Sequence, residues 1–152
     1  MTESPNDLIL TPDPRVPQRA TLSFGGQDYD CAIGRSGVAI DKREGDGATP
    51  VGRFGLRRVL YRADRETAPS TVLPVSTIAV DDGWCDAPGD PAYNRPVTLP
   101  YPASAERMWR EDGLYDLVVV LGHNDNPVIA NAGSAIFMHV KPAGGGPTAG
   151  CV

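Results

Sequence analysis

The sequence predicts a single, mainly β domain, and three observations point to this fold class. The chain has 152 residues, of which 41% are hydrophobic and 22% charged, and this size and composition suit one globular domain with its own core. Its 17 glycines and 15 prolines are spread among short apolar runs, as expected for short elements joined by tight turns. Most of these runs alternate in polarity or are rich in β-branched residues, which favours strands.

Residues 1–20 are predicted to form an N-terminal extension, and residues 21–152 the folded domain. The first 17 residues are Pro-rich, and Leu8-Ile9-Leu10 is their one apolar cluster. The start of the chain is acidic and polar and lacks the basic region and apolar core of a signal peptide. No apolar run approaches the roughly 18 residues that cross a bilayer. The chain as written is therefore expected to have no membrane span and to stay in the cytosol.

The first half of the domain is predicted to contain four strands. Polarity alternates over 27–33, which places Tyr29, Cys31 and Ile33 on one face of a strand. Further strands are expected over three shorter or less regular runs: 37–40, 54–61 and 71–80, the last interrupted by Pro74.

The second half begins with an irregular, Pro-rich stretch over 81–102 and continues with one predicted helix. This short helix spans 103–111 and turns Met108 and Trp109 inward. The β-branched run 117–121 predicts a strand that is buried on both faces. A last strand is expected over 133–140.

The last predicted strand carries the first candidate catalytic residue, His139. Period-two alternation places Ile136, Met138 and Val140 on one face, so His139 lies on the other face at the strand's end. Twelve positions later, after a Gly- and Pro-rich loop, comes Cys151. A thiol with a pKa near ~8.5 is a weak nucleophile at neutral pH, and an adjacent imidazole activates it by taking its proton. The pair therefore indicates cysteine-based acyl transfer, with Cys151 as nucleophile and His139 as base.

Glycine before the nucleophile fits the same chemistry. Gly150 allows close approach of the backbone, and the amides of Gly150 and Cys151 are expected to face a developing oxyanion. The alternative for each residue is structural, because a lone Cys is often a small buried hydrophobe and a strand-end His often only packs.

Other ligand classes find little support in the composition. The formal net charge of −5 provides no basic surface for nucleic acid. No close pair of Cys or His residues suggests a metal site. The three cysteines are odd in number and widely spaced, so we expect no disulfide framework and at least one free thiol.

His139, the following loop and Thr148-Ala149-Gly150-Cys151-Val152 resemble the catalytic signature of the L,D-transpeptidase family, the YkuD-like domain. Upstream, residues 42–54 are similar to the family's segment G-x-x-T-P-x-G-x-F. Residues 93–96 and 116–124 resemble a small bacterial branch of the family. The resemblance covers about residues 30–152.

The resemblance implies a mixed-strand β-sandwich with short helices and a reaction that needs no cofactor. It assigns the nucleophile to Cys151, the base to His139 and the family's Ser/Thr to Thr148. The implied reaction is attack on an L,D-peptide bond of a peptidoglycan stem peptide, followed by transfer of the acyl group to an amine acceptor. That substrate implies a location in the cell envelope or periplasm. Many members continue past the nucleophile, so we expect the domain 21–152 to be incomplete at its C-terminus.

Two alternatives stay open. The same dyad can pass the acyl group to water, as in an L,D-carboxypeptidase or amidase, or the domain can be a non-catalytic cell-wall binding module. His123 and Asn124, which follow the run 117–121, are candidate substrate-binding residues. For His123 we favour a structural role in a turn. The sequence does not indicate an oligomeric state.

Overall fold

The computed structural model describes residues 3–152, so the first two residues of the predicted extension lie outside it. The described range contains no helix, and its strands are β1 (Ile9–Pro12), β2 (Arg19–Phe24), β3 (Gln27–Ala32), β4 (Val38–Ala39), β5 (Thr49–Pro50), β6 (Leu56–Tyr61), β7 (Val75–Thr77), β8 (Asp82–Cys85), β9 (Pro96–Thr98), β10 (Ala105–Arg107), β11 (Leu117–Leu121) and β12 (Phe137–His139). The prediction of a mainly β fold is confirmed. The short helices expected from the family resemblance are wrong for this part of the chain. No segment of residues 3–152 forms a helix that could cross a membrane.

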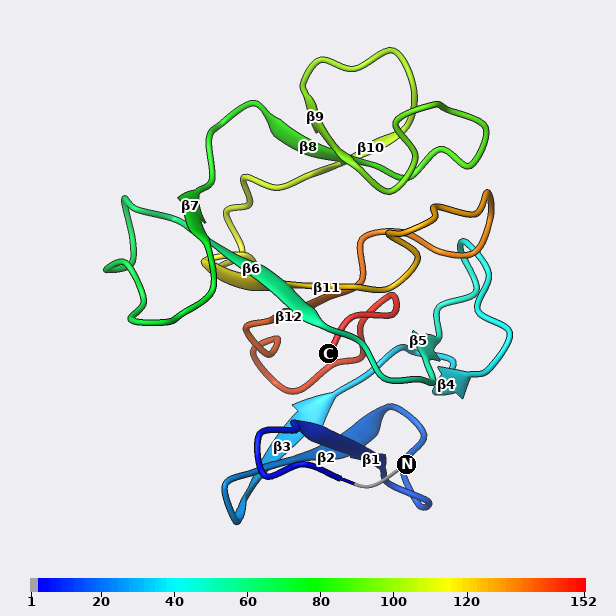
Figure 1. Cartoon of the computed structure of the whole chain (residues 1–152), viewed down its shortest axis with the longest axis vertical. Coiled ribbons are helices and arrows are strands. Elements are labelled where there is room, and N and C mark those ends of the chain that lie inside the picture. The colour runs from blue at the N-terminus through cyan, green and yellow to red at the C-terminus, as the bar shows by residue number, and fades with distance from the viewer. Residues whose placement is uncertain (1–2) are drawn as a thin grey trace.

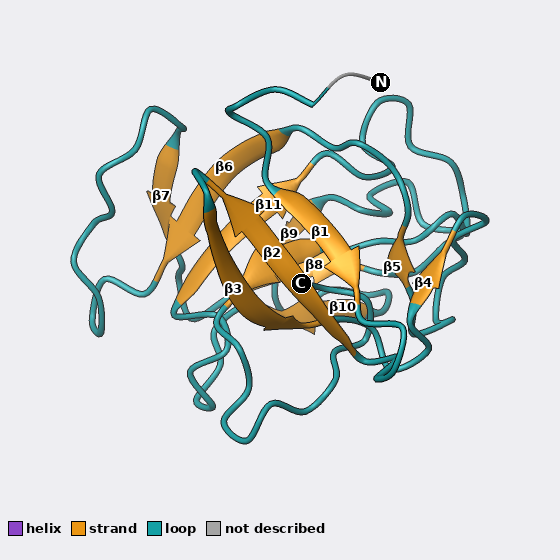
Figure 2. Cartoon of the chain, turned by 90° about the horizontal axis from the view of Figure 1, so that it is seen from below, coloured by secondary structure: helices purple, strands orange, loops and turns teal. Residues whose placement is uncertain are grey.

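The strands form three stacked sheets and one small parallel pair (Figure 1). The middle sheet has the order β12-β11-β6-β7, in which only β6 and β7 are parallel. An antiparallel sheet of order β10-β8-β9 covers one side, and the β1-β2-β3 sheet lies on the other. Figure 2 looks onto the β1-β2-β3 sheet, with strands of the other two sheets behind it. The parallel pair β4-β5 lies beside the middle sheet.

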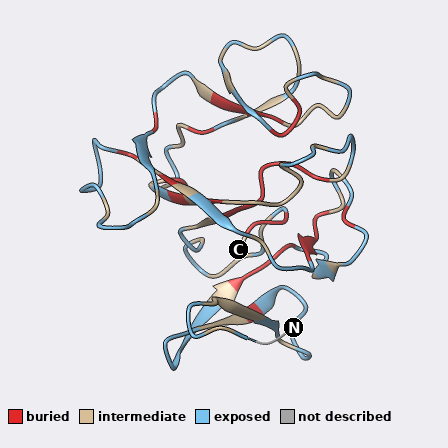
Figure 3. Cartoon of the chain, viewed as in Figure 1, coloured by how far each residue is buried: buried red, intermediate tan, exposed pale blue. Residues whose placement is uncertain are grey.

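The hydrophobic core lies between the middle sheet and the β10-β8-β9 sheet, and Figure 3 shows buried segments in both of these sheets. Its buried members are Ile78, Trp84, Met108, Tyr115, Val118, Val120, Ala135, Phe137 and Cys151. Phe137 packs edge-on against Trp84 and Tyr115, with ring centroids 5.0 and 5.8 Å apart. The candidate nucleophile is therefore part of the core and does not lie on the open surface.

The β2–β3 hairpin contains one strand that the sequence predicted, β3, and one that it did not, β2. Phe24 pairs with Gln27, so the loop consists of Gly25 and Gly26 alone, at φ +58° and +79°. Such two-residue turns require positive φ values, which glycine adopts without strain. The Gly-Gly pair between two alternating runs predicts this hairpin, although only its second strand was expected. β1, within the segment expected to be an extension, pairs with β2 over Ile9–Pro12.

The run 117–121 forms β11 as predicted, but its burial is one-sided. Val118 and Val120 are buried in the core, while Leu117 is 38% exposed. The prediction of a strand buried on both faces is therefore wrong. The predicted strand 133–140 is shortened to β12, because Gly133 and Ala135 have φ values of +99° and +52° that do not continue a ladder. Alternation along β12 agrees with the prediction, since Phe137 lies in the core and Met138 lines a cavity on the other side.

The helix predicted over 103–111 is wrong. Ala105–Arg107 forms β10, which pairs with β8. A nine-residue helix is marginal in water, whereas pairing with a neighbouring strand satisfies the same backbone groups. The inward direction of Met108 and Trp109 is nevertheless confirmed, since Met108 is 2% exposed and Trp109 packs against the core.

Candidate active site

The chain around Cys151 runs along the free edge of β12. Val152 donates from its amide to the Phe137 carbonyl and accepts from the His139 amide, both at 3.0 Å. The Cys151 sulfur accepts from the Phe137 amide at 3.4 Å and donates its proton to the Ala135 carbonyl at 3.2 Å. The strand that carries His139 thereby positions the thiol as well.

Ala135, whose carbonyl accepts the hydrogen bond from the thiol, is held in an unusual conformation. Its φ of +52° is uncommon for a residue other than glycine. The Ala135 amide donates to the side-chain oxygen of Asn94 at 3.1 Å, and this oxygen also accepts from the Trp84 indole at 2.9 Å. Asn94 is buried, so it fixes the direction of the Ala135 carbonyl toward the sulfur.

The surroundings of the thiol favour its protonated form. Burial raises the pKa of Cys151 to about 12, and the charge of Glu106 acts in the same direction. The Phe137 amide and the Tyr115 hydroxyl oppose this rise in pKa, without cancelling it. The thiol in this conformation is therefore un-ionised at neutral pH.

Tyr115 and Glu106 form a polar pair beside the sulfur that the sequence did not reveal. The Tyr115 hydroxyl donates to a carboxylate oxygen of Glu106, and the Tyr115 ring lies edge-on to His139 with centroids 5.2 Å apart. Burial raises the pKa values of both Glu106 and Tyr115. Arg110 lies over the Tyr115 ring, 5.0 Å from its centroid, and 4.0 Å from the Glu106 carboxylate. Tyr115 thus acts on both residues of the predicted dyad, through a ring contact with His139 and through the pKa of Cys151.

His139 has a defined tautomer. Its Nδ1 lies 2.8 Å from the Val140 carbonyl, and because a carbonyl can only accept, Nδ1 carries the hydrogen and Nε2 presents a lone pair. Burial lowers the pKa of His139, so the imidazole is neutral near pH 7. Within residues 3–152, no hydrogen bond joins His139 to Cys151. The structure therefore places the two predicted residues on paired segments but does not connect their side chains.

Thr148 and Gly150 shape the turn before the thiol. The Thr148 hydroxyl donates to the Cys151 carbonyl at 2.6 Å and accepts from the Gly150 amide at 3.1 Å. Gly150 has φ +144°, and a Cβ at this position would lie 2.9 Å from the Ala48 carbonyl oxygen. Of the two predicted oxyanion donors, the Gly150 amide is thus already used. The Cys151 amide has no acceptor within the described chain.

Thr49, from the segment 42–54, forms hydrogen bonds that stabilise the same turn. Its hydroxyl donates to the Gly150 carbonyl and accepts from the Gly34 amide, both at 2.9 Å. Thr49 is buried, and within the described structure its hydroxyl is the only hydrogen-bond partner of the Gly34 amide and the Gly150 carbonyl.

His123 and Asn124, the two predicted substrate-binding candidates, make their side-chain hydrogen bonds within their own loop. The His123 Nε2 lies 2.9 Å from the Ala132 carbonyl, and its ring lies edge-on to Phe54. The Asn124 side chain bonds to the backbone of Ile129 and to the Gly133 carbonyl. Burial lowers the pKa of His123. These contacts organise the loop that leads to Ala135.

The three cysteines are free thiols, and Cys31 and Cys85 lie outside the candidate site. Burial raises their pKa values, that of Cys31 to about 11. Among residues 3–152, no cluster of three or more His, Cys, Asp or Glu side chains is arranged to hold a metal ion.

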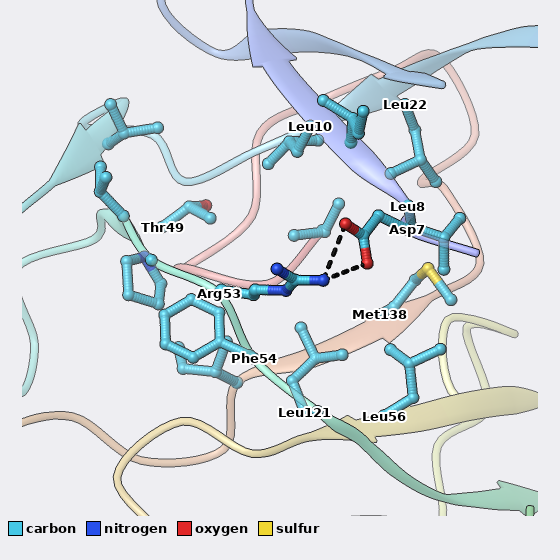
Figure 4. A pocket seen from close by; sticks show the side chains of 18 of the residues that line it. Asp7, Leu8, Leu10, Leu22, Thr49, Arg53, Phe54, Leu56, Leu121 and Met138 are labelled. Carbon is cyan, nitrogen blue, oxygen red and sulfur yellow. Dashed lines mark hydrogen bonds and ion pairs between the residues drawn. The ribbon is translucent and has the colours of Figure 1, made fainter. Parts of the chain in front are cut away.

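A cavity of about 900 Å³ lies on the opposite face of β12 from the thiol (Figure 4). Met138 and Leu121 line it from the middle sheet, and Leu8 and Leu10 from the N-terminal segment. Within it, Arg53 forms an ion pair with Asp7 at 2.7 Å. The cavity separates the β1-β2-β3 sheet from the middle sheet and has no lining residue in common with the predicted dyad.

The fold and site define a small β-sandwich domain that places a thiol and an imidazole on paired segments at one sheet edge. A family model for the L,D-transpeptidase catalytic domain, YkuD, matches residues 18–152. The chain belongs to this family, and membership implies L,D-transpeptidase-type catalysis on peptidoglycan substrates. No curated protein and no solved structure was found to match the chain.

Proposed function

We propose that this domain is a cysteine acyltransferase that forms an acyl-enzyme on Cys151 from a peptidoglycan stem peptide. The observation that best supports the proposal is the state of His139. Its imidazole is neutral and has a free Nε2 lone pair, and it lies on the strand whose edge pairs with the Cys151 segment. A base of this kind needs both the correct tautomer and the correct protonation state.

In the proposed reaction, Nε2 of His139 takes the Sγ proton while the sulfur attacks the carbonyl carbon of the L,D-peptide bond. The Cys151 amide donates to the developing oxyanion, an interaction worth about 3 kcal/mol. His139 then returns the proton to the amine of the leaving D-alanine as the C–N bond breaks. An acceptor amine finally gives a proton to His139 and attacks the thioester carbonyl carbon. The C–S bond breaks as the new C–N bond forms, and the Cys151 thiolate takes the proton back from His139.

The resting contacts imply a conformational step before this chemistry. The thiol donates to the Ala135 carbonyl and has a raised pKa, so it must leave this partner to reach His139. Substrate binding is the proposed trigger, since hydrogen bonds of this kind often form only in the substrate complex.

The site assignment is tested by acylation with a carbapenem. Attack of Cys151 on the strained lactam opens the ring and leaves a thioester, which intact-protein mass spectrometry detects as one adduct. Cys151→Ala should show none, whereas Cys31→Ala should remain acylated. An adduct on Cys31 or Cys85 contradicts the assignment.

Product analysis decides between transfer and hydrolysis. A tetrapeptide stem is incubated with and without an amine acceptor, and the products are separated by mass. A new amide that requires the acceptor supports the transferase. Release of the tripeptide at the same rate in both reactions identifies an L,D-carboxypeptidase that uses the same dyad. If Cys151 is not acylated and the protein turns over no peptide, the remaining alternative is a cell-wall binding module.

A further inference from the structure

A second, smaller recess of about 200 Å³ opens between the β8-β9 strands and the β6-β11 strands. Cationic, aromatic and aliphatic side chains line it, among them Arg58, Arg95, Trp84, Asn94, Ile136 and Phe137. It is smaller than the roughly 300–1,000 Å³ of a typical ligand pocket. A site of this size suits one terminal residue of a peptide better than a whole peptide.

The recess carries an excess of positive charge, although the chain as a whole has a net charge of −5. Arg57, Arg58 and Arg95 surround it together with a single carboxylate, that of Asp125. Arg57 already pairs with this carboxylate at 2.8 and 3.3 Å. Arg95 donates to the backbone carbonyl of Asp125 at 2.8 Å, which leaves its charge uncompensated.

Arg58 is the cation best placed to receive an anion. Its guanidinium lies 5.9 Å from the centroid of the Trp84 ring. Within residues 3–152 it makes no ion pair and no side-chain hydrogen bond. Its five N–H donors are therefore available in the planar arrangement that matches a carboxylate.

The wall of the recess touches the groups that hold the nucleophile. Asn94 accepts from the Ala135 amide, and the Ala135 carbonyl accepts from the Cys151 thiol. Phe137 also lines the recess, and its amide donates to the Cys151 sulfur. A ligand in the recess thus contacts the same residues that set the position of the sulfur.

We propose that this recess binds the carboxylate of the C-terminal residue of the peptide that Cys151 attacks, with Arg58 as its main partner. Ile136 and Phe137 provide an apolar wall for a small side chain, and Arg95 adds a second positive charge. The inference rests on the proposed function for the identity of the peptide. The binding of a small carboxylate, however, is measurable without turnover.

The binding test titrates the protein with N-acetyl-D-alanine and, separately, with N-acetyl-D-alanine amide, followed by NMR chemical shifts of the Trp84 indole. The acid should bind more tightly than the amide. Arg58→Gln should weaken the binding of the acid by roughly tenfold or more, because it removes a charge-assisted pair of hydrogen bonds. Arg58→Lys should lie in between, since it keeps the charge but loses the fork. Arg15→Gln, which makes the same change in net charge at an exposed position, should bind like the wild type.

Several results would overturn the proposal. These are equal affinities for acid and amide, equal affinities in wild type and Arg58→Gln, or no shift with millimolar acid. Tighter binding of inorganic phosphate than of the acid would identify a general anion site instead. Melting curves of Arg58→Gln and Arg58→Lys establish that both proteins are folded.

Kinetics with tetrapeptides that end in a carboxylate or in an amide separate this inference from the proposed function. If the acid binds through Arg58 but no variant turns over peptide, the subsite stands and the acyltransferase proposal fails. If acid and amide peptides turn over with equal kcat/KM in wild type and Arg58→Gln, the acyltransferase stands and the subsite fails.

Discussion

The Cys151 sulfur makes hydrogen bonds to two backbone groups in the core, the Ala135 carbonyl and the Phe137 amide. The Tyr115 hydroxyl acts on the same thiol by lowering its pKa. Glu106, held by Tyr115, adds a negative charge that disfavours the thiolate. The charge state of the proposed nucleophile therefore depends on residues that belong to neither half of the predicted dyad.

Replacing Glu106 by Gln should make the thiol more reactive. The carboxylate charge raises the pKa of Cys151, so its removal lowers this pKa and increases the thiolate fraction at a given pH. Alkylation of Cys151 by iodoacetamide between pH 7 and 10 should become roughly three- to tenfold faster. Tyr115→Phe keeps the ring but removes the hydroxyl that lowers the pKa of Cys151, so it should shift the rate in the opposite direction. Equal rates in all three proteins would contradict the role of this pair.

Removal of the proposed base, His139, should have a different effect from removal of the loop histidine, His123. His139→Ala should reduce turnover of a stem peptide by about 10²–10⁴-fold, the usual contribution of a general base. Combining it with Cys151→Ala should cost little beyond the single variants, because residues that act as one unit are not additive. His123→Ala serves as the control and should retain turnover wherever its melting curve shows a folded protein. Loss of turnover in folded His123→Ala, with His139→Ala active, would reverse the assignment of the base.

Among the elements, the local sequence pattern predicted correctly those strands whose own residues favour an extended conformation. The run 117–121 is β-branched throughout and forms β11, and the alternation around Phe137 places His139 on the predicted face of β12. The segment 103–111 behaved differently, since pairing with β8 overrode its helical pattern. That outcome depends on residues about 20 positions away, which no local window contains.

The same distinction explains which site residues the sequence revealed. His139 and Cys151 lie close together in the chain and carry reactive groups, so their types and spacing suggest a function. Asn94 reaches Ala135 across 41 positions, and Thr49 reaches Gly150 across 101. The side chains of Asn94 and Thr49 are common types for a loop and a strand. They come close to the thiol only once the chain has folded.

Thr49→Val tests how much the element pair β4-β5 supports the turn before Cys151. The substitution keeps the shape of the side chain but leaves the Gly34 amide and the Gly150 carbonyl without their partner. We expect a loss of about 1–3 kcal/mol in the free energy of unfolding, measured by urea denaturation. Thr98→Val, at an exposed position of β9, is the matched control and should change stability little. Equal stabilities of the two variants would show that the hydroxyl bridge contributes nothing.

The whole molecule consists of two well-packed sheets and a third that is set apart by the large cavity. Ionic contacts help to fix the loops between these layers. One of them joins the buried Lys42 to Asp46, whose carboxylate also accepts from the amides of Arg43 and Ala48. Burial raises the pKa of Asp46, but these hydrogen bonds and the charge of Lys42 outweigh it and leave the pKa lowered.

Asp46 should therefore contribute to stability in a pH-dependent way. Its folded pKa lies below the unfolded value of about 3.9, so its stabilisation is present above that pH and is lost as the pH falls through the folded pKa. Asp46→Asn should lower the free energy of unfolding by about 1–3 kcal/mol at pH 7. The difference from wild type should shrink toward pH 2.5 in thermal melts. The exposed Asp41→Asn is the control, and a constant difference for Asp46→Asn at all pH values would contradict the linkage.

The burial of Cys151 also bears on how long the protein survives in an oxidising environment. Peroxides convert thiolates to sulfenic acid, and their rate of attack follows the thiolate fraction and the exposure of the sulfur. Cys151 in its resting state offers little of either, because it is buried and its pKa is raised to about 12. The contacts that hold the thiol in its un-ionised form therefore also slow its oxidation.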